Sequence, residues 1–157
     1  MTRTMTSTLG AEEQATAGAA LQATLSDLID LSLVAKQAHW NLVGRNFRSV
    51  HLHLDEVVDT ARLFSDTVAE RAAAIGVSPD GRARTVSSST AVPEHPEGWV
   101  TDGTVVEWFV GALAAVIGGL RERITAVEDA DLVTQDLLIG ITAELEKHHW
   151  MFQAELA

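Results

Sequence analysis

All three prolines of this 157-residue chain lie between residues 79 and 96, and the long stretches on either side have none. Proline ends or kinks a helix because it lacks an N–H and its ring clashes with the preceding turn. Before this segment, apolar residues recur at helical spacing over residues 13–42 and again over residues 47–75. The pattern therefore predicts two long helices, separated by a turn at residues 44–46.

The second half of the chain repeats this arrangement. Thr101 and Asp102 are candidate caps for a third helix to about residue 127, and a fourth follows to about residue 155. The connection between the second and third helices is long, with at most one short helix in it. Two helical hairpins joined by one long crossover predict an all-α, ferritin-like four-helix bundle over residues 13–157. Residues 1–12 are small and polar and are expected to form a flexible arm.

Composition limits the function. The formal net charge is -11, so the surface should repel nucleic-acid phosphates and anionic membranes and attract cations. The chain has no cysteine, which excludes disulfides and thiolate metal sites. The start carries no apolar run of signal-peptide length, and no segment approaches about 18 apolar residues. We therefore expect a cytoplasmic protein without a membrane partner.

Histidines and acids cluster on the first hairpin. His51 and Asp55 lie four residues apart, so their side chains share one face of the second helix, and Asp66 and Glu70 repeat that spacing. His39 lies as far before Arg45 as His51 lies after it, so the two imidazoles should face each other across the turn. Mixed imidazole and carboxylate ligands suit iron, manganese or zinc.

The length of the second helix divides these candidate ligands into two groups that lie far apart. His51 and Asp66 are fifteen residues apart on one helix, about 22 Å at 1.5 Å per residue, so they cannot bind one ion within one chain. A two-fold axis that pairs this helix with its symmetry mate would place His51 and Asp55 beside the partner's Asp66 and Glu70. The spacing therefore predicts a metal site shared at a dimer interface.

Other interpretations stay open from spacing alone. A histidine or acid on a helix usually points into water. An intra-subunit di-iron site would need two Glu-x-x-His motifs, and the chain has one, Glu146 to His149. His148 and His149 are therefore predicted to lie at the surface or at a pore rim. A purely structural or DNA-compacting shell with inactive site residues is the non-enzymatic alternative.

Several short motifs match those of a known family in identity and spacing. The strongest are Lys36-Gln37-Ala38-His39-Trp40-Asn41, Gly44, Asn46-Phe47, His51, Asp55-Glu56, Asp66, Ala69-Glu70-Arg71 and Pro79-Asp80-Gly81. Weaker matches are Asp136-Leu137-Leu138, Leu145-Glu146-Lys147 and Trp150. On these residues the chain resembles the Dps family, the mini-ferritins named as DNA-binding proteins from starved cells, and looks like an actinobacterial member.

The resemblance implies a hollow homododecamer that protects against oxidative damage. Ferroxidase sites at its two-fold interfaces would oxidise Fe²⁺ to Fe³⁺, with hydrogen peroxide preferred over dioxygen, and a ferric mineral would be stored inside. His39, His51 and Asp55 would come from one subunit, and Asp66 and Glu70 from the other. Trp40 matches the family's tryptophan beside the site, where a redox function and a buried packing function are both open.

The resemblance also implies acid-lined iron-entry pores near the start of the last helix. Asp136 matches that pattern well and Asp131 approximately, although Leu132 and Val133 stand where some relatives carry another acid. DNA binding is not expected, because Arg3 is the only base in residues 1–20 and the end of the chain carries no basic extension. The nucleoid is nevertheless an alternative location within the cytoplasm.

Overall fold

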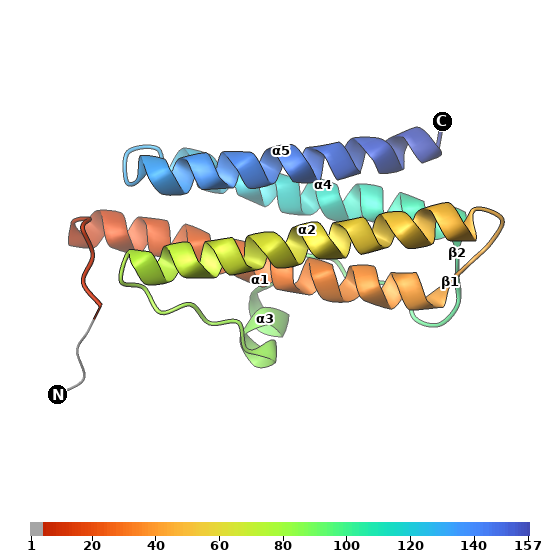
Figure 1. The fold of residues 1–157 in the computed structure, drawn as a ribbon, viewed down its shortest axis with the longest axis horizontal. Coiled ribbons are helices and arrows are strands. Elements are labelled where there is room, and N and C mark those ends of the chain that lie inside the picture. The colour runs from red at the N-terminus through yellow and green to blue at the C-terminus, as the bar shows by residue number, and fades with distance from the viewer. Residues whose placement is uncertain (1–4) are drawn as a thin grey trace.

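Four long helices form the bundle in the computed structural model, which describes residues 5–157 (Figure 1). They are α1 (Ala11–Asn41), α2 (Phe47–Ala74), α4 (Asp102–Ala126) and α5 (Leu132–Glu155). The predicted ferritin-like bundle with a long crossover between the second and third long helices is confirmed. The predicted helix ends agree to within two residues, which is the usual uncertainty of a helix boundary.

The core lies between two antiparallel hairpins, α1 with α2 and α4 with α5. Apolar residues three and four apart place their side chains on one face of each helix, and these faces pack together. Phe109 of α4 and Phe152 of α5 stack with ring centroids 5.2 Å apart. Buried residues from the other helices include Leu21, Leu25, Leu28, Leu54, Val57, Leu138, Ile141 and Leu145.

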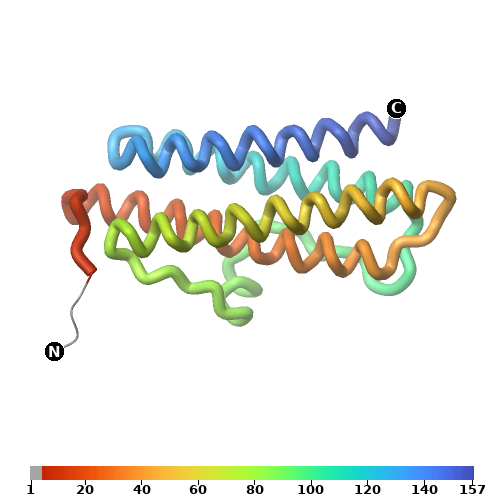
Figure 2. The backbone as a smooth tube through the Cα atoms, in the orientation of Figure 1, coloured from red at the N-terminus to blue at the C-terminus, as the bar shows by residue number. Residues whose placement is uncertain are grey.

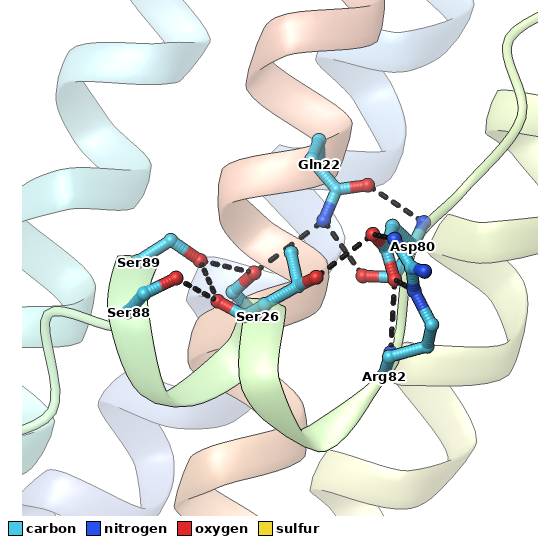
Figure 3. Close-up of polar contacts among 7 residues, drawn as sticks. Gln22, Ser26, Asp80, Arg82, Ser88 and Ser89 are labelled. Carbon is cyan, nitrogen blue, oxygen red and sulfur yellow. Dashed lines mark hydrogen bonds and ion pairs between the residues drawn. The ribbon is translucent and has the colours of Figure 1, made fainter.

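The crossover returns the chain along the bundle, from the end of α2 to the opposite end where α4 begins (Figure 2). It contains one short helix, α3 (Ala83–Ser89), as the sequence allowed. Polar contacts attach it to α1 (Figure 3). The Gln22 amide donates to the Asp80 carbonyl at 3.0 Å and accepts from the Asp80 N–H at 2.8 Å, and Ser89 donates to Ser26 at 2.9 Å.

A buried carboxylate on α1 joins three segments of the chain. Asp27 of α1 is 1% exposed. Its Oδ1 accepts from the N–H of Ala91 in the crossover at 2.7 Å, and its Oδ2 pairs with Arg123 Nη2 of α4 at 2.7 Å. The ion pair compensates the buried charge, so the crossover and α4 are fixed against the same turn of α1.

The turn between α1 and α2 is fixed by the start of α4. Gly44 has φ +142°, and a Cβ there would lie 2.4 Å from the Asp102 carboxyl carbon, so this position requires glycine. Asp102 Oδ2 accepts from the N–H of Asn46 at 2.6 Å. Beside it, two short strands that the sequence did not predict, β1 (Leu42–Val43) and β2 (Val100–Thr101), pair in parallel. Thr101 caps α4 as predicted.

The predicted arm is partly ordered. Helix α1 begins at Ala11, and Leu9 packs against the core. Residues 1–4 lie outside the described part of the chain, so a flexible arm stays a prediction.

Two helices, α1 and α4, are long and apolar enough to span a membrane by length and composition. The expectation that no segment approaches such a span is therefore wrong. In the bundle, 61% of the most apolar 18-residue window of α1 and 44% of that of α4 is buried. The buried residues of both helices, such as Leu21 and Leu28 of α1 and Phe109 and Leu113 of α4, belong to the core.

Candidate metal centre

Two histidines meet where α1 ends and α2 begins. The rings of His39 and His51 stack with centroids 3.5 Å apart and planes 21° from parallel. Phe47 stacks on the outer side of His51 at 4.8 Å. The expectation that the two imidazoles face each other across the turn is confirmed.

Reciprocal hydrogen bonds orient both rings. His39 Nδ1 lies 3.0 Å from the carbonyl oxygen of His51, and His51 Nδ1 lies 3.0 Å from the carbonyl oxygen of His39. A carbonyl oxygen can only accept, so each Nδ1 carries the proton and donates it. Each Nε2 therefore carries the lone pair of the neutral ring, which is the form in which imidazole binds a metal, and that of His39 accepts from Lys36 Nζ at 3.3 Å.

Asp55 joins this pair from the next turn of α2. Its Oδ1 lies 3.3 Å from His39 Nδ1 and accepts from Lys36 Nζ at 2.5 Å. The hydrogen bond from Lys36 is the main cause that lowers the pKa of Asp55 below its ordinary value, and partial burial opposes it. The carboxylate is therefore ionised at neutral pH and available as an anionic ligand.

The other two predicted ligands lie elsewhere on the same helix. Asp66 and Glu70 are exposed on α2, which continues unbroken from His51, so the distance of about 22 Å between His51 and Asp66 stands. Within residues 5–157, no three histidine or acid side chains are arranged to hold an ion. The structure thus brings together His39, His51 and Asp55 and leaves Asp66 and Glu70 apart.

Trp40 follows His39 directly and is 64% exposed. Burial as a packing residue within the subunit is therefore wrong for this side chain. Its redox function stays a prediction.

The two predicted pore acids differ sharply in environment. Asp136 is exposed on the first turns of α5. Asp131 is buried and caps α5, since its carboxylate accepts from the N–H groups of Val133 and Thr134 and from Arg71 Nη2 at 2.5 Å. Burial alone would raise the pKa of Asp131, but the hydrogen bonds from Thr134 and Arg71 outweigh it and hold the pKa below its ordinary value. A pore function for either acid stays a prediction.

His148 was predicted at the surface, and this is wrong. It is buried, with Nδ1 3.2 Å from His53 Nε2 and Nε2 3.0 Å from Thr60 Oγ1. Burial lowers the pKa of His148 below its ordinary value, and His53 acts in the same direction. His148 lies three residues after Leu145 and four before Phe152, so its spacing along the apolar face could have indicated burial.

The alternative Glu-x-x-His motif is not assembled into a site by the described residues. Glu146 lies at the surface, where Arg121 Nε donates to its Oε1 at 2.9 Å. His149, three residues later, is partly exposed. The motif therefore supplies no intra-subunit centre of the di-iron type.

The bundle defines a ferritin-like protein, and the family model of the ferritin-like domain matches residues 18–157. Among solved structures, Dps from Mycobacterium smegmatis superposes with a TM-score of 0.92 at 35% identity, covering 99% of this chain and 94% of that one. Dps from Microbacterium arborescens, in a high iron form, superposes with a TM-score of 0.91 at 31% identity, and the match covers 96% of this chain and 98% of that one. DpsA14 from Streptomyces coelicolor superposes with a TM-score of 0.92 at 29% identity, and the match covers 98% of this chain and 92% of that one.

Similarity to curated proteins shows to which family of ferritin-like proteins the chain belongs. The DNA protection during starvation protein of Mycolicibacterium smegmatis is 39% identical over 140 residues, which cover 87% of this chain and 74% of that protein. DNA protection during starvation protein 2 of Deinococcus radiodurans is 35% identical over 94% of this chain, which spans 61% of its length. The chain belongs to the Dps family of mini-ferritins, and its similarity to the actinobacterial members confirms the predicted resemblance.

Proposed function

We propose that this chain is a ferroxidase and iron-storage subunit that oxidises Fe²⁺ at sites shared between two copies of the chain. The observation that carries the proposal is the pair of histidines whose Nδ1–H groups are held by backbone carbonyls beside an ionised aspartate. This arrangement presents two nitrogen lone pairs and one carboxylate from a single corner of the bundle. It is half of a ligand set for a transition metal.

The second half would come from Asp66 and Glu70 of a neighbouring copy. Both acids are exposed on α2, on the same helix as His51. An isologous contact that pairs two α2 helices antiparallel completes two sites at once, because each copy gives one half to each site. Oxygen ligands from the partner would add the anionic charge that a ferric product favours.

The iron is the substrate of this reaction. Neutral imidazoles accommodate the ferrous ion that enters, and the carboxylates stabilise the ferric ion that forms. Two ferrous ions give two electrons to one hydrogen peroxide, which takes up two protons and yields two waters. Dioxygen is the alternative oxidant. The family relation supports storage of the ferric product inside a hollow dodecamer, with Asp136 as a candidate for the entry pore.

The starvation proteins among the relatives are named for DNA protection. For this chain we propose that protection acts through removal of ferrous iron and peroxide in the cytoplasm. A formal charge of -11 opposes contact with a phosphate backbone.

Mixing two inactive variants tests the shared site. His51→Ala and Asp66→Ala should each oxidise Fe²⁺ slowly, because every site lacks one ligand. In a random co-assembly about half of the interfaces are mixed, and one of the two sites in each mixed interface is intact. About a quarter of all sites should then work, so the initial oxidation rate should recover to about a quarter of the wild-type rate.

A second mixture is the matched control. His51→Ala and Asp55→Ala remove ligands from the same half, so every site in their co-assembly keeps one defect and no activity should return. Mass spectrometry must show both subunits in each shell, and light scattering must show an assembly much larger than one chain. A mixed His51→Ala and Asp66→Ala shell that stays inactive would refute the shared site.

A further inference from the structure

One side chain at the half-site is not among its predicted ligands. Lys36 lies on α1 three residues before His39, so the two side chains share a face of that helix. Its ammonium nitrogen lies 2.5 Å from Asp55 Oδ1 and 3.3 Å from His39 Nε2. A positive group thus lies between a carboxylate oxygen and an imidazole lone pair, which are two of the atoms proposed to bind Fe²⁺.

The surroundings make this contact stronger than an ordinary surface pair. The side chain of Lys36 is only 26% exposed, so water and salt screen its charge incompletely. The stacked His39 ring, which is buried, closes one side. An ammonium hydrogen bond to a carboxylate is among the stronger hydrogen bonds in proteins.

Assembly would add further negative charge to the same place. If the proposed interface forms, the partner's Asp66 and Glu70 approach Asp55, and three carboxylates share one small volume. Like charges at such distances repel unless a cation lies among them. In the absence of iron, Lys36 is the cation that the chain itself provides there.

We infer that Lys36 is the internal counter-ion of the iron-free centre and that a divalent cation must displace it to bind. The inference rests on the proposed function. Lysine suits this because its ammonium is a compact charge on a flexible four-carbon stem, which can swing away without backbone movement. Lys36 is therefore a positioning residue with two effects: it stabilises the metal-free interface, and it lowers the affinity for divalent ions by competing with them.

Because Lys36 has both effects, Lys36→Met should bind divalent ions more tightly and, without metal, assemble more weakly. Titration calorimetry with Co²⁺, which is not oxidised by air under these conditions, measures binding without catalysis. Because the variant loses a charged hydrogen bond that competes with the ion, it should bind Co²⁺ about tenfold more tightly than the wild type. Without metal, the variant's weakened assembly should dissociate at a higher protein concentration than the wild type does, as measured by light scattering on dilution, and Co²⁺ should restore it.

The chain offers a matched control, because Lys147 is its only other lysine. Lys147 is exposed on α5 and pairs with Glu144 at 3.4 Å. Lys147→Met removes the same charge and should leave both measurements unchanged. Lys36→Arg keeps the charge and should stay near the wild type in metal-free assembly.

The outcomes separate the two proposals. Unchanged or weaker Co²⁺ binding by Lys36→Met would overturn the inference and leave Lys36 as a support for the Asp55 carboxylate. Loss of assembly in Lys147→Met as well would show that net charge alone is responsible, and would overturn it too. If the wild type binds no Co²⁺ at all, the shared metal site itself is wrong, and the inference falls with it.

Discussion

Replacing Asp131 by alanine should destabilise the first turn of α5. We expect this local destabilisation, rather than slower iron entry through a pore, to be the main effect of the substitution. The carboxylate accepts from the N–H groups of Val133 and Thr134, from the Thr134 hydroxyl and from Arg71. Alanine removes all of these acceptors at once. It also leaves the Arg71 guanidinium, whose side chain is 22% exposed, without its anionic partner.

The size of the loss follows from these contacts. Removal of an aspartate N-cap costs about 1 kcal/mol. The lost hydrogen bond to a partly buried charged group adds about 1–2 kcal/mol, reduced from the fully buried case because Arg71 can reach some water. Local opening of the first turn of α5 should thus become easier by about 2–3 kcal/mol, which corresponds to about 30- to 150-fold faster exchange.

Hydrogen exchange followed by mass spectrometry measures this directly on peptides that span the α4–α5 turn. Asp131→Asn keeps a capping oxygen and should show a smaller acceleration, and Asp136→Asn should show none. Equal exchange in wild type and Asp131→Ala would refute the capping argument. Slower iron uptake in Asp136→Asn with unchanged exchange would instead support a pore function for that residue.

The same contact predicts a pH dependence. Because the folded-state pKa of Asp131 lies below its ordinary value, its ionised form stabilises the native state above the unfolded-state pKa. This contribution is lost as the pH falls from about 4 towards the depressed value. The difference in thermal midpoint between wild type and Asp131→Asn should therefore be largest near neutral pH and shrink in acid. A difference that grew below about pH 4 would contradict the sign.

Three further predictions concern separate features. Asp55→Ala and Glu70→Ala should each lower the rate of ferrous oxidation strongly while light scattering shows an intact assembly; near-normal rates in both would place the site elsewhere. Arg123→Met should destabilise the fold by about 3 kcal/mol in denaturant titrations, because Asp27 keeps a buried charge without its partner. The 157-residue chain should not shift duplex DNA in gels at physiological salt and pH, and a salt-tolerant complex would refute this.

Helix positions could be predicted well because two independent signals agreed. Apolar spacing defined the buried faces, and the confinement of proline to the crossover defined where helices could not continue. The strands at Leu42–Val43 and Val100–Thr101 could not be predicted, because two residues show no alternation. Their pairing depends on a turn that meets the start of α4 far along the chain.

The surroundings of the site residues were harder to predict than the helices, because spacing along the sequence does not show which side chains from other helices lie beside a residue. An aspartate just before a helix fits both an N-cap and an acidic pore. The hydrogen bonds from the N–H groups of Val133 and Thr134 show the cap for Asp131, and the ion pair with Arg71 of α2, which sequence spacing does not reveal, buries its carboxylate. His148 follows a charged stretch, which concealed its place on the apolar face. Lys36 was part of the matched motif, but its contact with Asp55 depends on how α1 packs against α2.

The spacing of the four ligands on α2 also locates the two-fold axis of the proposed interface. His51 and Glu70 are centred between residues 60 and 61, and so are Asp55 and Asp66. At 100° per residue the four side chains fall within a sector of about 100° on one side of the helix.

Asp59 and Arg62 share that centre, are exposed and lie within the same sector, so each should face the other's counterpart across the axis. Asp59→Arg or Arg62→Asp alone places like charges together and should weaken assembly, as measured by light scattering at low salt. The double variant Asp59→Arg/Arg62→Asp restores opposite charges and should restore assembly. If the double variant is no better than the singles, the axis does not lie at the midpoint of α2.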